Sequence, residues 1–153
     1  MTPTTDTEAA FEAPSRVALA SHAHWFPRIA LASVFLYHGI SKFAGGLAVP
    51  PMLELSPLTW ALVATAEVAG GALVLAGGVL GTRWGDIATR LGGLAIAPVM
   101  LGAIALVHWP RWSFTAAPDQ GFPMGGMEFQ VVLLFIALFF VLRGNAGGDM
   151  IRL

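Results

Sequence analysis

Five ionisable residues lie within or at the edges of apolar stretches, and they are the candidates for chemistry. They are His38, Lys42, Glu67, His108 and Glu128. An ionisable side chain inside an apolar, membrane-length helix is costly, so it marks a functional site by default. His38 and Lys42 are four residues apart and share one face of a helix. Imidazole, amine and carboxylate groups placed together can bind a polar ligand group and transfer protons.

Glu67 is the most informative of these residues. Its helical face carries mostly small residues, which permit close helix packing in lipid: Ala64, Gly70, Gly71, Val74 and Gly78. We therefore expect Glu67 to point into a helix bundle. A carboxylate there needs a partner or a proton, and the partner must come from another helix. His38 lies at matching depth, and Lys42 lies one turn further outward.

Two interpretations of these polar residues stay open. In the functional one, His38 and Glu67 are catalytic: His38 donates a hydrogen bond to a ligand, and Glu67 relays a proton. Lys42, His108 and Glu128 then complete the substrate-binding set. In the structural one, a Glu67–His38 or Glu67–Lys42 bond only holds two helices together. Lys42 is also placed to extend its amine to the headgroups. Plain solvation is the simpler interpretation of His108 and Glu128, which lie at span ends.

Several other chemistries are excluded or not expected. The chain has no cysteines, which excludes disulfides, thiol catalysis and cysteine-ligated clusters. Its His, Asp and Glu residues lack metal-ligand spacing within one helix, so we expect no metal site. The net charge is −1 without a basic patch, so nucleic acid is not an expected partner.

The elements that position these residues are four apolar stretches. The chain of 153 residues is 56% hydrophobic and only 11% charged, with a mean hydropathy of +0.73. A membrane-spanning helix needs roughly 17–25 residues, and all four stretches fit. They cover about Phe26–Ala44, Leu58–Leu80, Ile87–Trp109 and Met124–Leu142. We predict an all-α fold, an integral membrane bundle of four transmembrane helices.

Charge and tryptophan positions predict the orientation of this bundle. Numbering span ends alternately places six arginines on one side (Arg16, Arg28, Arg83, Arg90, Arg143 and Arg152) and only Lys42 and Arg111 on the other. By the positive-inside rule, both termini are cytoplasmic in a multi-pass protein of the cell membrane. The five candidates then lie in the outer half of the membrane or at its outer edge. All five tryptophans fall near span ends, as expected for headgroup-level indoles.

The expected organisation has one folded unit. Residues 1–15 form a disordered tail, residues 16–25 a juxtamembrane lead-in, residues 26–146 the transmembrane domain and residues 147–153 a cytoplasmic tail. Residues 81–86 are expected to be a tight inner turn. Within the third stretch, Arg90 and His108 would share one face of a regular helix with Ala97 and Leu101, and Pro98 is expected to bend it.

Three segments resemble the DoxX family of small membrane proteins. They are RIALASVFLYHGISKF (28–43), AEVAGGALVLAGGVLGTR (66–83) and GGMEFQVVLL (125–134). The resemblance covers about residues 28–150, and the residues matching its motifs are His38, Lys42, Glu67, Arg83 and Glu128. It implies a four-helix integral membrane protein. It also implies an association with membrane oxidoreductase complexes and quinone-linked sulfur oxidation.

The leading functional hypothesis is therefore a membrane subunit of a redox system. It would interact with quinone, the candidate cofactor, or with a redox partner enzyme, through a polar pocket in the outer half of the bundle. The chain has no evident redox centre, so the partner would supply electrons. The lipid bilayer and a second copy of the chain are the other expected partners. The alternatives are a small-solute or proton-coupled transporter, and a purely structural or assembly subunit.

Overall fold

The part of the chain that the structure describes is all-helical. The computed structural model describes residues 22–81 and 83–145. Those residues form four α-helices and no strand: α2 (Trp25–Ala44), α3 (Pro57–Val79), α4 (Arg83–Ala103) and α5 (Glu128–Arg143). Each helix corresponds to one of the four apolar stretches. The expected tails, residues 1–15 and 147–153, and most of the lead-in lie outside the described residues.

Local chemistry explains several helix boundaries. The Ser56 hydroxyl caps α3 by accepting the Thr59 amide at 3.0 Å, and Pro57 occupies the first helical position. Helix α4 begins at Arg83, not at Ile87, so the expected turn over residues 81–86 is shorter than predicted. It continues through Pro98 and ends in a π-helix, η2 (Ile104–His108).

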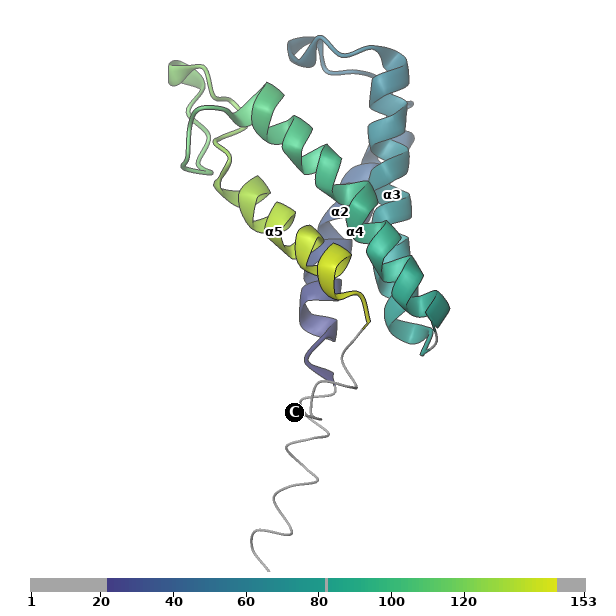
Figure 1. The fold of residues 1–153 in the computed structure, drawn as a ribbon. Coiled ribbons are helices and arrows are strands. Elements are labelled where there is room, and N and C mark those ends of the chain that lie inside the picture. The colour runs from purple at the N-terminus through teal and green to yellow at the C-terminus, as the bar shows by residue number, and fades with distance from the viewer. Residues whose placement is uncertain (1–21, 82, 146–153) are drawn as a thin grey trace, which may run out of the picture.

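The helices pack in chain order, as Figure 1 shows. Helix α3 packs against both α2 and α4, α5 packs against α4, and α2 and α5 touch only over a short stretch. The connections 45–56 and 109–127 lie at one end, which we call the long-loop end. The opposite, short-turn end holds the start of α2, the α3–α4 turn and the end of α5. Toward the long-loop end, α2 and α3 diverge from α4 and α5 (Figure 1).

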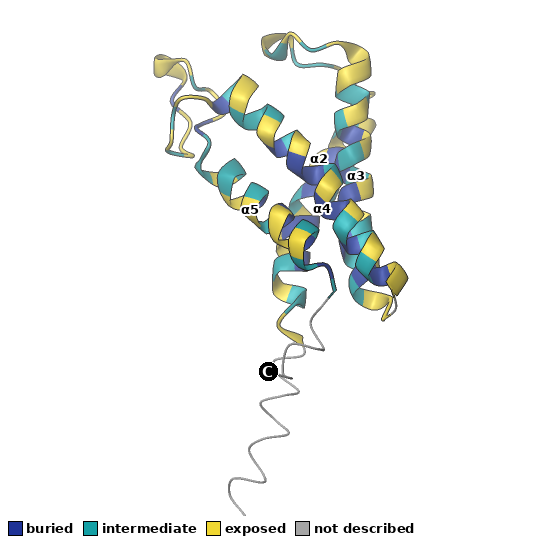
Figure 2. Cartoon of the chain, viewed as in Figure 1, coloured by how far each residue is buried: buried dark blue, intermediate teal, exposed yellow. Residues whose placement is uncertain are grey.

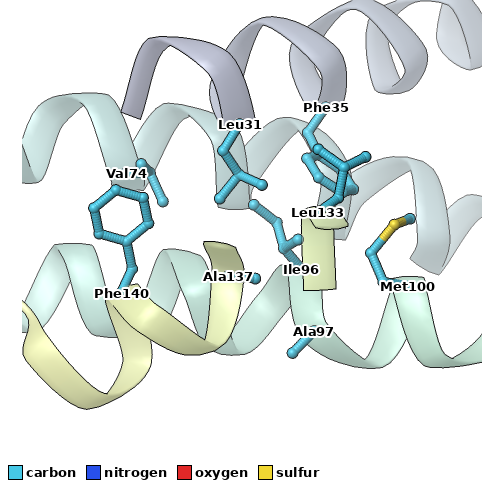
Figure 3. Close-up of a cluster of buried hydrophobic side chains, with 9 residues drawn as sticks. All are labelled: Leu31, Phe35, Val74, Ile96, Ala97, Met100, Leu133, Ala137 and Phe140. Atoms are coloured by element: carbon cyan, nitrogen blue, oxygen red, sulfur yellow. The ribbon is translucent and has the colours of Figure 1, made fainter. Parts of the chain in front are cut away.

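Glycines allow the helix backbones to approach closely at the centre. A Cβ added at Gly92 would lie 2.8 Å from the Gly70 carbonyl oxygen, so α3 and α4 meet backbone to backbone. The buried residues gather at this crossing (Figure 2). All four helices contribute apolar side chains to the core drawn in Figure 3, among them Phe35, Val74, Ile96 and Phe140.

The outer surface of the helices is apolar. Large hydrophobic side chains are exposed on every helix, including Phe26, Leu62, Leu94 and Phe135. Two helices, Pro57–Val79 and Arg83–His108, are by length and composition able to cross a membrane. Helix α5 has 16 residues and is about 24 Å long, shorter than the roughly 30 Å hydrocarbon layer. An apolar exterior of this extent is what lipid, rather than water, solvates.

Candidate functional site

A buried ion pair joins α2 to α3 toward the long-loop end. The Lys42 Nζ donates to both carboxylate oxygens of Glu67, at 2.9 Å to Oε1 and 2.7 Å to Oε2. Glu67 is only 4% exposed, and the Lys42 side chain is 13% exposed. Glu67 therefore points into the bundle, as its small-residue face predicted, and it takes its partner from another helix. Gly77 is buried on that face instead of Gly78.

Close backbone contact and an aromatic ring hold this pair in place. A Cβ added at Gly39 would meet Glu67 Cβ and the Ala64 carbonyl oxygen, each at 3.0 Å. Glycine at this position thus lets α2 lie directly against α3 beside the carboxylate. The Lys42 Nζ also lies 4.9 Å from the centre of the Trp60 ring, within range of a cation–π interaction. Trp60 belongs to the first turn of α3.

His38 lies at the exposed surface of α2, one turn before Lys42. Its ring meets the Tyr37 ring edge to face, with the ring centres 5.5 Å apart. Gly39 is the residue turned toward α3, so its neighbour His38 is rotated away from that interface. The structure therefore joins Glu67 to Lys42 and not to His38. The two predicted catalytic residues share a region of the bundle without a bond between them.

His108 is buried beside the second long connection. It is 4% exposed and ends η2. Its Nδ1 lies 2.9 Å from the Gly125 carbonyl oxygen, and its Nε2 lies 2.9 Å from Gln130 Nε2. Because a carbonyl oxygen only accepts, Nδ1 carries the proton, and Nε2 accepts from the Gln130 amide. Plain solvation is therefore wrong for His108: a polar network in the loop and α5 satisfies it.

Glu128 begins α5 and is partly exposed. Its Oε2 accepts the Phe114 amide at 3.3 Å, and its own amide donates to the Trp112 carbonyl at 2.9 Å. Its role in the described structure is to fasten the 109–127 connection to α5. The five candidates thus occupy three places: the Lys42–Glu67 pair, the surface beside it at His38, and the loop network of His108 and Glu128.

A second polar centre lies at the short-turn end, around Arg28, whose charge predicts only the orientation of the bundle. Arg28 is 1% exposed. Its Nη1 donates to the Val74 carbonyl at 2.6 Å and to Thr89 Oγ1 at 2.9 Å, and its Nη2 donates to Asn145 Oδ1. The guanidinium also lies 4.9 Å from the Phe140 ring centre. The sequence pattern does indicate this burial, because Arg28 lies seven residues before the core residue Phe35, on the same helical face.

His24 accepts a hydrogen bond from this arginine. The Arg28 Nε donates to His24 Nδ1 at 3.2 Å, just before α2 begins. Partial burial, the charge of Arg28 and that of His22 lower the pKa of His24 below its ordinary value of 6.5. The neutral imidazole is the form that can accept this hydrogen bond.

A second arginine closes the same end. The Arg90 guanidinium donates to the carbonyls of Val141 and Leu142 at 2.8 Å, satisfying free carbonyls at the end of α5. Its Nε pairs with Asp86 at 2.8 Å, and Asp86 accepts the Asn145 amide at 2.7 Å. The short-turn end is thus a closed network of hydrogen bonds. Residues 22–81 and 83–145 contain no cluster of three or more His, Asp or Glu suited to a metal ion.

The chain matches the model of a known protein family. The model of the DoxX family matches residues 24–109, more than half of the chain. This range includes the whole of α2, α3, α4 and η2. It therefore contains Arg28 and the Lys42–Glu67 pair. No curated protein and no solved structure matches the chain.

Proposed function

The chain belongs to the DoxX family, a family of membrane proteins, and from this premise we propose that it is an integral membrane subunit of a redox system. All four helices would span the cell membrane as one domain over residues 26–146. The short-turn end and both termini would be cytoplasmic, and the long-loop end would face outward. The polar site in the outer half would interact with quinone or with a redox partner enzyme.

The observation that carries this proposal is the Lys42–Glu67 pair with His38 on the adjoining surface. Burying an ion pair is commonly no more stabilising than apolar packing, so its presence in an apolar bundle favours a chemical role. His38 is exposed on the surface of α2, which would face the bilayer in the proposed arrangement. It can therefore meet a lipophilic ligand that the buried pair, on its own, cannot reach.

The chemistry of a quinone suits these groups. Bound there, it would accept electrons supplied by the partner enzyme, and its reduction consumes protons. His38 would donate a hydrogen bond to a ring carbonyl. Glu67 would relay a proton, with its charge balanced by Lys42. His108 and Glu128, at the same end of the molecule, would connect this proton path to the outer face.

One observation favours a second candidate, a structural or assembly subunit. Both oxygens of Glu67 are already bonded to Lys42, so the pair fully satisfies itself across α2 and α3. On this reading the pair only fixes one helix against the other. Nothing in the described residues adds support to the transporter alternative.

Paired neutralising substitutions separate the two candidates. Glu67→Gln leaves the charge of Lys42 unbalanced, so it should lower the unfolding midpoint as well as ligand binding. Adding Lys42→Gln removes that charge and should restore much of the stability. In lipid nanodiscs, a short-chain ubiquinone should bind the wild-type protein. It should bind the Lys42→Gln/Glu67→Gln double variant and His38→Gln at least about tenfold more weakly.

The matched control is Glu54→Gln, an exposed acid in the 45–56 connection, which should bind like the wild type. If the stable double variant and His38→Gln both bind as the wild type does, the ion pair is structural and the quinone site must be abandoned. Absence of any quinone binding by the wild-type protein would leave the structural candidate.

A further inference from the structure

Three buried side-chain atoms in the described residues have no hydrogen-bond partner. They are Trp60 Nε1, Arg111 Nε and Gln130 Oε1. All three residues lie toward the long-loop end: in the first turn of α3, in the 109–127 connection and in the first turn of α5. At the short-turn end, by contrast, the buried Arg28 is bonded to several acceptors. Within the described residues, the buried side-chain atoms that lack a partner thus all lie toward the end where α2 and α3 diverge from α4 and α5 (Figure 1).

Trp60 is the one of these residues that contacts the ion pair. Its ring centre lies 4.9 Å from Lys42 Nζ, whereas Gln130 is bonded to His108 and Arg111 to Gln120. A buried N–H without an acceptor is costly, and such groups normally have a partner in the working protein. Because the Trp60 ring contacts Lys42, a partner for its N–H would bind beside the Lys42–Glu67 pair.

The chemistry of the indole limits what that partner is. An indole N–H only donates, so the partner must present an acceptor oxygen or nitrogen. The surrounding bundle is apolar, which favours a lipophilic molecule with few polar atoms. A ring carbonyl on a lipophilic quinone meets both conditions.

We propose that the Trp60 indole N–H donates a hydrogen bond to a carbonyl oxygen of a quinone bound beside the Lys42–Glu67 pair. This inference rests on the proposed function and names a ligand-binding residue for it. Trp60 approaches this site from α3, on the side of the ion pair where its ring contacts Lys42.

The substitution that isolates this hydrogen bond is Trp60→Phe. It keeps an aromatic ring near Lys42 and removes the N–H. The matched control is Trp112→Phe, which changes an exposed indole at the same end of the molecule. In nanodiscs, Trp60→Phe should weaken the binding of short-chain ubiquinone about three- to tenfold, the loss expected for one hydrogen bond. Trp112→Phe should leave binding unchanged.

A measurement on the unaltered protein tests the same contact. With ¹⁵N-labelled tryptophan, the Trp60 indole signal, assigned by its absence in Trp60→Phe, should move downfield when ubiquinone is added. Equal binding by the two phenylalanine variants would overturn this inference alone, as would a stationary Trp60 signal while quinone binds. If the wild-type protein binds no quinone, the proposed function falls and this inference falls with it.

Discussion

At the scale of residues, Lys42 and Arg28 differ in what satisfies their positive charges. Lys42 has a carboxylate partner, whereas the described contacts of Arg28 are neutral acceptors and an aromatic ring. The planar guanidinium distributes its donors over α3, α4 and the residue Asn145 beyond α5. Arg28 therefore ties all four helices together at one end. A lysine has no such fork, so it could not replace these bonds.

The His24–Arg28 bond predicts a pH-dependent stability. The pKa of His24 lies below 6.5 in the folded protein, so the unfolded chain takes up this proton more readily. Stability from this group is therefore fully present above about pH 6.5 and decreases as the pH falls toward the lower, folded-state pKa. The unfolding midpoint in mild detergent should drop between pH 7.5 and pH 5.5.

The control is His24→Gln, whose side-chain oxygen can still accept from Arg28 but does not titrate. This variant should lose less stability than the wild type over the same pH interval. An equal loss in both proteins would assign the pH dependence to other groups and contradict the prediction.

At the scale of elements, missing side chains determine how closely the helices pack. Gly71 is one such position between α2 and α3: an added Cβ would lie 3.0 Å from Leu36 Cγ and 3.3 Å from the Ala32 carbonyl oxygen. Gly39 makes the reciprocal contact from α2, next to Glu67. The stripe of small residues on α3 is therefore a packing surface on which the ion pair depends for its geometry.

Gly71→Leu should separate α2 from α3 and destabilise the bundle by about 1–3 kcal/mol, the usual cost of overpacking. Thermal unfolding in mild detergent measures this cost. Ala72→Leu provides the control, because Ala72 is the next residue along the chain and is exposed. If both leucine variants unfold at the wild-type temperature, the Gly71 face meets lipid rather than α2.

Much of the helical framework is predictable from the sequence because long apolar runs dominate it. Two local features of α4 and its continuation differ from the prediction. Arg83 to Asp86 looks like a polar turn, but forms the first turn of α4, where Asp86 suits the positive end of the helix dipole. Leu101 was expected to share a face with His108, yet Leu101 is exposed and His108 is buried. Regular helical spacing does not extend through the π-helix that follows.

The candidate site was predictable in type but not in pairing. The sequence indicated that Glu67 needs a partner on another helix, and it allowed either His38 or Lys42. The choice depends on the rotation of α2 about its axis. That rotation is fixed by the contact of Gly39 with α3, and a single sequence does not reveal it. The burial of Arg28 depends in the same way on four helices meeting at one point.

At the scale of the whole molecule, charge and packing differ between the two ends. The described residues of the short-turn end carry four arginines and one acid: Arg28, Arg83, Arg90, Arg143 and Asp86. The long-loop end carries two cations and four acids: Lys42, Arg111, Glu54, Glu67, Asp119 and Glu128. The positive end is closed by hydrogen bonds, whereas the other end holds the ion pair and the unpartnered buried atoms. This asymmetry supports an orientation with the positive end in the cytoplasm.

The orientation and the number of spans can be tested together, since the chain has no cysteines and single cysteines report their own position. Met52→Cys and Asp119→Cys, exposed in the two long connections, should react with a membrane-impermeant maleimide on intact cells. Gly81→Cys, in the opposite turn, should react only after permeabilisation. Leu62→Cys, exposed on α3, should stay unlabelled in the bilayer and react in denaturant, because lipid rather than water covers it.

Four spans require residues 52 and 119 to lie on the same side of the membrane, since two helices, α3 and α4, separate them. Labelling of these two cysteines from opposite sides would contradict the four-span bundle, and labelling of Gly81→Cys alone on intact cells would reverse its orientation.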